Sequence, residues 1–290
     1  MEFPVILGEG YETYDEYMAH LTRSDDYALH PARYWIEPFR IAGNLYYVGD
    51  RVVCAHLVDT GKGLILFDSG FPQCKHLLLH SIYSLGFDPK DIKYVIHSHG
   101  HFDHIGCSEE LRLLFGAKLC MSRVDVEAVA ACPEKAMFFM SADDQQQFPS
   151  HDILLEDGQV LTLGNTSVLC RLAPGHTEGT MAFFFHIQED DQTYRVGYLG
   201  GLGFNSLYKA YYEPMGMPDM QQVMAQTVKD LRREQVDICI ANHPGQNCTI
   251  ERREAMLRQP GRNPFLDSAA WTVLLDAIDE RLAGYAAHGL

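Results

Sequence analysis

The eight residues 97–104 constrain this chain more than any other segment, because they read His-Ser-His-Gly-His-Phe-Asp-His. Imidazole nitrogens bind zinc well, and carboxylate oxygens also bind it. The apolar stretch 92–96 predicts a buried strand before this run, and a helical pattern begins near Asp103. The run therefore lies on a strand-to-helix turn, where side chains can converge on one point. This context favours a metal site over a chance cluster of surface histidines.

Two further histidines follow predicted strands. His176 comes after Pro174-Gly175 at the end of one strand, and His243 comes two residues after another, 236–241. A single histidine at the end of a strand is usually structural or solvated. Three strand ends that each present histidine, however, supply the ligands that a two-metal site needs.

The order of these motifs resembles the metallo-β-lactamase superfamily. Its markers are Leu-Ile-Leu-Phe-Asp-Ser-Gly at 64–70, the histidine run at 99–104, Pro-Gly-His-Thr at 174–177, and His243. The resemblance covers about 39–247 and extends to the C-terminal helix. It implies an α/β (α+β) fold, a four-layer αβ/βα sandwich of two mixed β-sheets flanked by helices. The metal site would lie at one edge, between the sheets.

The resemblance also implies the metal ligands and a catalytic residue. The ligands of the first zinc would be His99, His101 and His176, and those of the second would be Asp103, His104 and His243. Such sets leave coordination positions open, which is typical of a catalytic site. Two Zn²⁺ ions are the expected cofactors, although iron or manganese can occupy similar sites. Asp103 is expected to hold a metal-bound hydroxide and to carry its proton to the departing atom.

One departure from the common pattern is informative. Many members, including glyoxalase II-like thioesterases and lactonases, carry a bridging aspartate after the strand that follows Pro-Gly-His-Thr. Here residues 198–203 read Tyr-Leu-Gly-Gly-Leu-Gly, and Gly201 occupies that position. The absence resembles subclass B3 metallo-β-lactamases. Subclass B1 needs a cysteine near Gly201 and lacks the equivalent of His104, and subclass B2 replaces the residue equivalent to His99. An aspartate introduced at position 201 is therefore expected to tighten the second metal.

Other residues are expected to support the site. Asp68 resembles the superfamily aspartate that orients ligating imidazoles, and Ser98 would support the turn by hydrogen bonding to the backbone. Candidates for the substrate pocket are Phe71, Tyr208, Lys209, Tyr211 and Tyr212. The alternative for the last four is that they belong to an ordinary amphipathic segment that covers the core. His56 and His186 lie in apolar strands and are expected to be satisfied core histidines, and His97 is expected to pack.

The remaining pattern predicts one domain with an extension before it. Residues 1–37 carry none of the motifs and form an N-terminal extension packed on the domain, with some helix around 11–21, and residues 38–290 form the domain. Strands are expected at 38–41, 44–48, 51–59, 63–68, 92–97, 152–155, 159–163, 167–172, 180–187, 193–199 and 236–241. Helices are expected at 73–85, 104–115, 122–131, 219–234 and 264–287, with a polar loop at 141–150.

Charge narrows the class of substrate. The 290 residues are 47% hydrophobic, enough for a sizeable core, and carry a net charge of −16. Such a chain repels nucleic acid and anionic lipid surfaces, so a small-molecule substrate is expected, with neither nucleic acid nor membrane as a partner. The acidic N-terminus lacks the pattern of a secretory signal, and the eight cysteines show no close pairing. We therefore expect a cytoplasmic protein with free thiols.

These observations favour one function over two alternatives. The favoured function is a dinuclear zinc-dependent hydrolase that opens a cyclic amide or ester, as a B3-like β-lactamase or a related lactam or lactone hydrolase does. A glyoxalase II-like thioesterase is the first alternative, and the missing carboxylate at Gly201 counts against it. A non-catalytic metal-binding protein is the second, and open coordination positions count against it.

Overall fold

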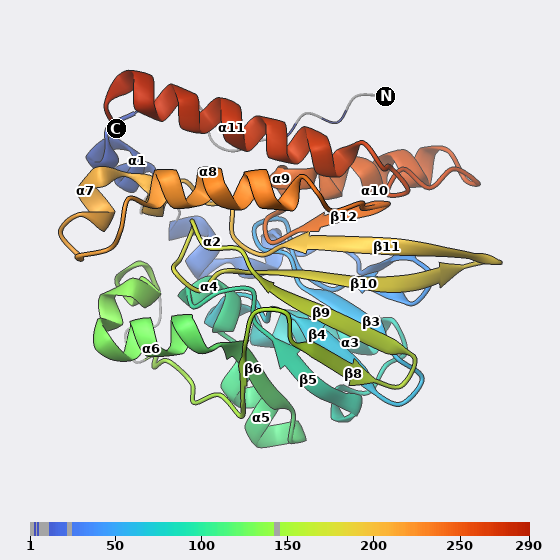
Figure 1. Ribbon diagram of the computed structural model, residues 1–290. Coiled ribbons are helices and arrows are strands. Elements are labelled where there is room, and N and C mark those ends of the chain that lie inside the picture. Colours follow the sequence, from blue (N-terminus) through green and yellow to red (C-terminus); the bar gives the residue numbers. More distant parts are fainter. Residues whose placement is uncertain (1–2, 4, 6–11, 22–24, 142–145) are drawn as a thin grey trace.

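Two β-sheets face each other at the centre of the computed structural model, which describes residues 3, 5, 12–21, 25–141 and 146–290 (Figure 1). The seven-stranded sheet has the order β1-β2-β3-β4-β5-β6-β7, and the five-stranded sheet has the order β12-β11-β10-β9-β8. The first sheet comprises β1 Phe39–Ala42, β2 Leu45–Tyr47, β3 His56–Asp59, β4 Leu64–Phe67, β5 Ile92–Ile96, β6 Lys118–Ser122 and β7 Ile153–Leu155. The second comprises β8 Val160–Leu163, β9 Thr166–Leu172, β10 Met181–Glu189, β11 Gln192–Leu199 and β12 Ile238–Ala241.

The alternation of side chains along β4 explains the layers. Ile65 and Phe67 point into the core between the sheets, whereas Leu64 and Leu66 point to the opposite face. The ring of Phe67 stacks on that of Phe185 from the second sheet, with centroids 5.3 Å apart. Since both faces of β4 are covered, all four of its residues are buried.

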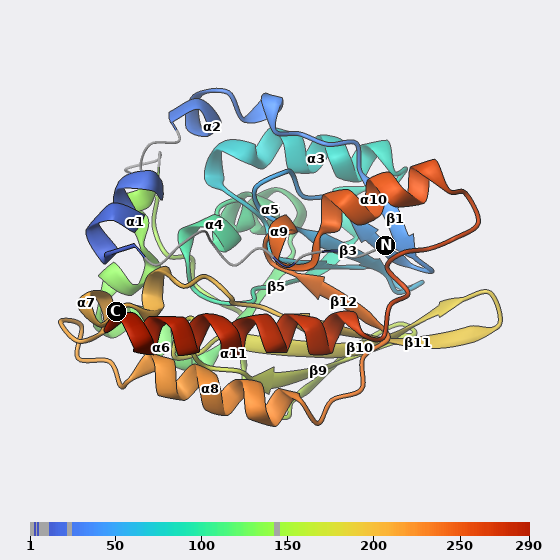
Figure 2. The same ribbon diagram turned by 90° about the horizontal axis from the view of Figure 1, so that it is seen from above.

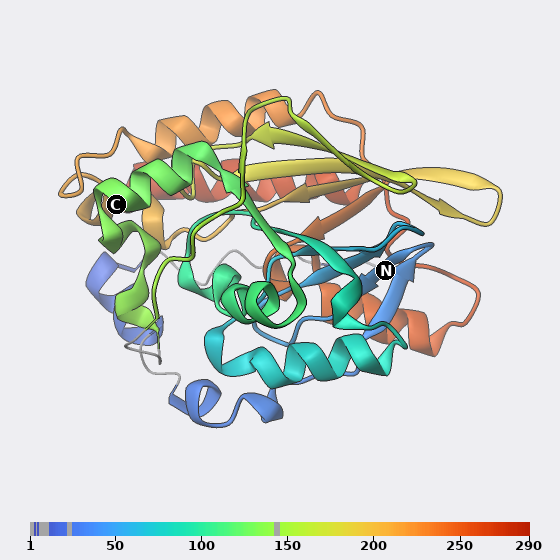
Figure 3. The same cartoon turned by 90° about the horizontal axis from the view of Figure 1, so that it is seen from below.

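Helices cover the outer face of each sheet. Helices α3 Lys75–Ser84 and α5 Ser108–Phe115 lie below the seven-stranded sheet (Figure 3). Helices α8 Met220–Leu231 and α11 Ala270–His288 lie above the five-stranded sheet (Figure 2). The predicted four-layer arrangement of two mixed sheets flanked by helices is confirmed. No helix in the described ranges is both long and apolar enough to cross a membrane.

The other α-helices in the described residues lie before, between and after these elements. They are α1 Tyr14–Leu21, α2 Asp25–Leu29, α4 Phe102–Ile105, α6 Arg123–Ala131, α7 Lys209–Tyr212, α9 Pro244–Asn247 and α10 Thr249–Arg258. Helix α1 lies beside α7 and the C-terminal end of α11 in both Figures 1 and 2, with the ring of Tyr14 5.5 Å from that of Tyr208. The helix expected around 11–21 is therefore present over 14–21, residue 11 lying outside the described part. The boundary between residues 37 and 38 stays a prediction.

Several expected elements differ from the structure. The strand expected at 51–59 contains only β3, because Asp50 Oδ1 accepts hydrogen bonds from the backbone nitrogens of Val52 and Val53 and folds 50–53 into a turn. The helix expected at 104–115 is two helices, α4 and α5. Gly106 lies between them, and a Cβ there would be 2.3 Å from the backbone nitrogen of Pro72. That close approach requires glycine and breaks the helix.

Several elements were not expected at all. Strand β6 and helices α2, α7, α9 and α10 lie in segments that the sequence patterns left unassigned, and the helix expected at 264–287 begins only at Ala270. In the expected loop 141–150, residues 146–150 have no regular structure, and 142–145 lie outside the described residues. Strand β6 pairs in parallel with both β5 and β7, so the sheet and not the local sequence determines its conformation.

Candidate metal centre

Three strand ends bring the expected ligands to one edge of the sandwich. His99 and His101 follow β5, and the next turn, α4, carries Asp103 and His104. His176 follows β9 in the loop before β10. His243 follows β12 and forms the N-cap of α9. Strands from both sheets thus bring these side chains to the same edge of the sandwich.

The first group of ligands forms a nearly equilateral triangle of imidazole rings. The ring centroids of His99 and His101 are 4.6 Å apart, and each lies 4.5 Å from that of His176. The rings are inclined to each other by 79–84°, so each presents an edge to the others. One ligand nitrogen from each ring lies within 4.8 Å of the other two, close enough for one ion to contact all three.

The second group surrounds the carboxylate of Asp103. Its Oδ2 lies 3.3 Å from Nε2 of His104 and 3.5 Å from Nε2 of His243. Ligand atoms of His99, Asp103 and His104 also lie within 4.8 Å of one another, which connects this group to the first. The side chain of His243 is 32% exposed, whereas those of Asp103 and His104 are 13% and 0% exposed, so solvent reaches this group mainly at His243.

Hydrogen bonds at Nδ1 turn the other ring nitrogen, Nε2, toward the centre. Nδ1 of His99 donates to the carbonyl of Gly200 at 2.7 Å, and Nδ1 of His176 donates to that of Gly203 at 2.7 Å. Nδ1 of His243 donates to the carbonyl of Val52 at 2.8 Å. Such bonds fix the tautomer and the orientation of a ligating imidazole.

Two buried nitrogens at the centre form no hydrogen bond of good geometry with a described residue. Nε2 of His99 and Nε2 of His104 are both shielded from solvent, and the contact of the latter with Asp103 Oδ2, at 3.3 Å, lacks hydrogen-bond geometry. A buried polar atom without a partner is costly, and a bound cation would satisfy both atoms at once. The donor set, rich in imidazole with one carboxylate, suits zinc.

The ionisation of these groups is consistent with a cation site. Burial lowers the pKa of His99 and of His176 well below the usual range and that of His101 to about 4, so these rings are neutral and able to bind metal. Burial opposes a charge on His104 too, yet the carboxylates of Asp103 and Asp68 raise its pKa to about 10. Two carboxylates therefore favour positive charge at this end of the site.

Asp68 and Ser98 lie directly behind the expected ligands. Asp68 Oδ2 accepts a hydrogen bond from His104 Nδ1 at 3.0 Å and another from Ser98 Oγ at 2.7 Å, and Oδ1 accepts from the backbone nitrogen of Ser98 at 2.7 Å. The hydroxyl of Tyr198, on β11, also donates to Oδ2. Sequence reasoning missed Tyr198, because a tyrosine in an apolar strand carries no sign of its partner.

Asp125 is a second residue that the sequence did not reveal. It is 2% exposed, on α6. Its carboxylate accepts hydrogen bonds from the backbone nitrogens of Gly100 and Gly179 at 2.8 and 2.7 Å, and from the hydroxyl of Thr177 at 2.9 Å. One carboxylate thereby joins the loop of His99 and His101 to the loop of His176.

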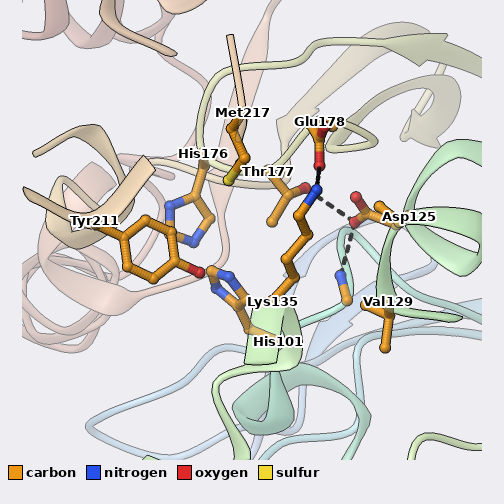
Figure 4. A pocket seen from close by; sticks show the side chains of 11 residues that line it. His101, Asp125, Val129, Lys135, His176, Thr177, Glu178, Tyr211 and Met217 are labelled. Carbon is orange, nitrogen blue, oxygen red and sulfur yellow. Dashed lines mark hydrogen bonds and ion pairs between the residues drawn. The ribbon is translucent and has the colours of Figure 1, made fainter. Parts of the chain in front are cut away.

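A pocket opens beside the first group of ligands (Figure 4). His101 and His176 form part of its wall, with Tyr211 and Met217 on one side and Val129 on the other. Lys135 extends along the pocket, and its Nζ lies 2.5 Å from Glu178 Oε2. Lys135 is the one lysine or arginine among the described residues that line this pocket.

The other residues expected at the pocket lie farther back. Tyr208 is buried, with its ring 4.9 Å from that of Tyr285, and Tyr212 is buried, with its hydroxyl 3.4 Å from Asp219. Lys209 is partly exposed at the start of α7. Phe71 packs edge-on against Phe102, at 5.4 Å. Of the five, the structure places Tyr211 alone in the described wall, and the substrate role of all five stays a prediction.

Three other histidines behave differently from one another. The ring of His56 is fully buried between those of Tyr47 and Tyr198, but neither ring nitrogen bonds to a described residue, so the expectation of a satisfied core histidine is wrong for His56. It is also wrong for His186, which is exposed on β10. His97 is buried, with its ring nitrogens 3.1 Å from His151 Nε2 and 2.6 Å from Ser108 Oγ.

Comparison with known proteins identifies the family. The model of the metallo-β-lactamase superfamily matches residues 48–190, which contain the histidine run and the Pro-Gly-His-Thr motif. The chain belongs to the metallo-β-lactamase superfamily. Its fold, and relatives that are named as hydrolases, make it a metal-dependent hydrolase of that superfamily.

Solved structures of the superfamily share the whole fold. The metallo-β-lactamase FEZ-1 from Legionella gormanii is 27% identical, with a TM-score of 0.77 over 87% of this chain and 96% of that chain. Subclass B3 metallo-β-lactamases, one of them described as a di-zinc enzyme, also superpose at 24% identity, a level that shows the fold alone.

Two relatives of this chain are named as different hydrolases. A probable polyketide biosynthesis zinc-dependent hydrolase, PksB of Bacillus subtilis, is 30% identical over 96 residues, which span 33% of this chain and 35% of that protein. The hydroxyacylglutathione hydrolase GloC of Haemophilus influenzae is 26% identical over 223 residues, 74% of this chain and 92% of that protein. The match to PksB thus spans about a third of that protein, and of the two names only that of GloC states a substrate.

Proposed function

We propose that this chain is a dinuclear zinc hydrolase that opens a cyclic amide or ester, in the manner of a B3-like β-lactamase or a related lactam or lactone hydrolase. His99, His101 and His176 would hold one ion, and Asp103, His104 and His243 would hold the other. The observation that carries the proposal is the convergence of these side chains, with Nδ1 of four imidazoles bonded away from the centre.

The chemistry follows from the donor set. Zinc held by these residues would supply a water that ionises near neutral pH and a Lewis acid for the carbonyl oxygen of a substrate. The neutral rings of His99, His101 and His176 supply lone pairs without competing protons. The carboxylate of Asp103 would accept a hydrogen bond from the attacking water and pass that proton to the departing nitrogen or oxygen.

Two features favour a cyclic amide or ester as substrate. Gly201 stands where thioesterases of the superfamily carry a bridging carboxylate, and the fold is shared with subclass B3 enzymes. The pocket wall combines Tyr211, Met217 and Val129 with one lysine, Lys135, that is already paired with Glu178. These side chains would contact an apolar part of a substrate at one side of the ions and would offer one cation to an anionic group, since the cavity itself has room for little more than one water molecule.

A thioesterase of the hydroxyacylglutathione hydrolase type is the second candidate. The match to GloC favours it, because it spans most of both chains. A glutathione thioester carries two carboxylates, and the described pocket wall offers one cation for them. The two candidates therefore differ in a property that a substrate panel measures directly.

The decisive experiment joins a metal assay to that panel. Zinc per chain is measured by atomic spectrometry, and hydrolysis is followed for a chromogenic cephalosporin, an acyl lactone and a glutathione thioester, before and after chelation. We expect two zinc ions per chain, turnover of the lactam or lactone, loss on chelation and recovery with zinc. Turnover of the thioester alone would support the second candidate.

A pair of variants tests the ligand assignment. His101→Ala should lose zinc and all hydrolysis together, because it removes one side of the triangle. His186→Ala is the matched control, since His186 is exposed on β10, away from the ligands, and should retain both. Full zinc content in His101→Ala would refute the assignment.

A further inference from the structure

The anchor of His243 is a backbone turn outside the ligand motifs. His243 is a third exposed, and its Nδ1 donates to the carbonyl of Val52 at 2.8 Å. The backbone nitrogen of Cys54 donates to the carbonyl of Asn242 at 2.9 Å, so the turn 50–54 is bonded both to the residue before His243 and to the ring of His243. The position of this turn therefore sets the position of the imidazole.

Asp50 determines the shape of that turn. The residue is 6% exposed, and its Oδ1 accepts hydrogen bonds from the backbone nitrogens of Val52 at 2.7 Å and Val53 at 2.9 Å. With these two N–H groups held by one oxygen, the Val52 carbonyl is directed toward His243. The other carboxylate oxygen remains available for a partner outside the turn.

That partner comes from the segment before the first sheet. The hydroxyl of Tyr27, on α2, donates to Asp50 Oδ2 at 2.6 Å, and the thiol of Cys74 lies 3.5 Å from the same oxygen. Tyr27 is 4% exposed. Burial, and then the charge of Asp50, raise the pKa of Tyr27 far above its usual value, so the hydroxyl stays a donor.

The ring of Tyr27 also supports the helix that carries the other two ligands of this group. It packs edge-on against Phe71, with centroids 4.9 Å apart, and Phe71 packs in the same way against Phe102 at 5.4 Å. Phe102 opens α4, where Asp103 and His104 follow. In contrast, His99 and His176 are anchored by the carbonyls of Gly200 and Gly203, beyond the end of β11.

We propose that Tyr27 and Asp50 form a positioning pair that tunes the affinity of the second metal without touching it. The inference rests on the proposed function, because it takes Asp103, His104 and His243 as the ligands of that metal. The pair acts through the Val52 carbonyl on His243 and through Phe71 and Phe102 on α4. The segment 25–50 thus contributes to the metal site although it contains none of the expected ligands.

The test compares two tyrosine variants in a stepwise zinc titration. Tyr27→Phe removes the bond to Asp50 and keeps the ring. Tyr34→Phe is the matched control, because the Tyr34 hydroxyl bonds only weakly to Asp26 at the surface, at 3.2 Å, and lies in the same segment. Metal-free protein is titrated against a chromophoric chelator, which gives the two dissociation constants separately.

We expect Tyr27→Phe to weaken the affinity for the second zinc by up to about tenfold and to leave the affinity for the first zinc unchanged. This is the lower end of the effects seen when residues that orient metal ligands are replaced. Tyr34→Phe should leave both constants unchanged. The double variant Tyr27→Phe/Asp50→Asn should be no weaker than Asp50→Asn alone, because the two residues act through one bond. The melting temperature of each metal-free variant separates this effect from a loss of folding.

The outcomes distinguish this inference from the function on which it rests. If the wild-type protein binds two zinc ions and Tyr27→Phe shifts neither constant, or shifts both equally, the positioning pair is overturned and the dinuclear site stands. If the wild-type protein binds only one zinc ion, the dinuclear site fails, and the inference fails with it.

Discussion

The carboxylate of Asp125 accepts a hydrogen bond from the backbone nitrogen of Gly100 at 2.8 Å, so a residue of α6 holds the turn between His99 and His101. The same carboxylate bonds to Thr177, which follows His176. Three imidazoles from two distant loops therefore depend on one buried side chain for their spacing. Burial raises the pKa of Asp125 to about 6, although its hydrogen bonds with Thr177, Gly100 and Gly179 oppose the rise.

Asp125→Asn should lower both the stability of the fold and the affinity for the first metal. An amide has one acceptor oxygen, so its NH₂ group must face the N–H of Gly100 or that of Gly179. Leaving such a buried donor unsatisfied costs about 1–3 kcal/mol of unfolding free energy. Urea unfolding and a zinc titration measure the two effects. Glu127→Gln, exposed on the same helix, is the control and should change neither. Wild-type zinc affinity in Asp125→Asn would show that the loops hold their spacing without this carboxylate.

Asp68→Asn should lower the affinity for the second metal. The carboxylate accepts from His104 Nδ1 and from Ser98 Oγ, and the neutral amide removes the charge that strengthens these bonds. Replacing such partners of a ligating histidine typically costs about 10–100-fold in metal affinity. We expect a loss in this range for the second zinc, measured by competition with a chelator. Asp191→Asn, an exposed change of the same type, should have no effect. An equal loss at both metals would contradict the role assigned to His104.

The sequence could suggest the expected ligands because their signals are local. Each of the three groups contains a histidine within a few residues of the end of an apolar strand, and a short segment suffices to show it. Asp125 lies 25 residues from Gly100 and 52 from Thr177. Its local pattern, Ser122 followed three residues later by an acidic residue, is typical of a helix N-terminus, and Ser122 does accept from the backbone nitrogen of Asp125. The sequence pattern around Asp125 is therefore fully explained by the helix N-terminus and gives no sign of the hydrogen bonds to Gly100 and Thr177.

The sheets were predictable from alternation, but one strand was not. Strand β6 reads Lys-Leu-Cys-Met-Ser and lacks the β-branched apolar residues that mark β4 and β5. It is extended because β5 and β7 pair with its two edges, which is a property of the tertiary structure. The turn at 50–53 was missed for a related reason, since the apolar residues after Asp50 resemble a continuing strand while its side chain bonds to their backbone.

Gly201→Asp should weaken the binding of the first metal. The sequence alone predicts instead that an aspartate at this position would tighten the binding of the second metal. A Cβ at Gly201 would lie 2.9 Å from Cβ of His176 and 2.8 Å from Cγ2 of Thr180, so any side chain must displace the ligand. Gly201→Ala isolates this steric effect and should also lower zinc content. Gly100→Ala is the comparison, because a Cβ there meets its neighbours at ordinary contact distances of 3.4 Å or more. Tighter zinc binding in Gly201→Asp would show that the loop yields and that a bridging carboxylate can form.

The buried ring of His56 should make the stability of the metal-free protein depend on pH. Burial lowers the pKa of His56 to about 4, against a slight opposing effect of Asp68. In the unfolded chain this histidine binds a proton below about pH 6.5, whereas in the folded chain it stays neutral until about pH 4. The unfolded state therefore binds more protons in this window, and stability falls as pH decreases through it.

His56→Leu should remove that contribution. Between pH 7 and pH 5 the wild-type protein should lose about 2 kcal/mol more unfolding free energy than the variant, as the linkage relation gives for this shift. Urea unfolding with chelator present at both pH values measures the difference, and the metal ligands contribute equally to both proteins. His186→Leu, on the exposed face of β10, is the control and should keep the wild-type dependence. Because His56 leaves two buried nitrogens unsatisfied, the leucine variant should also be at least as stable as the wild-type protein at pH 7. A parallel pH dependence in the wild-type protein and His56→Leu would mean that the ring finds a proton acceptor or water in the folded state.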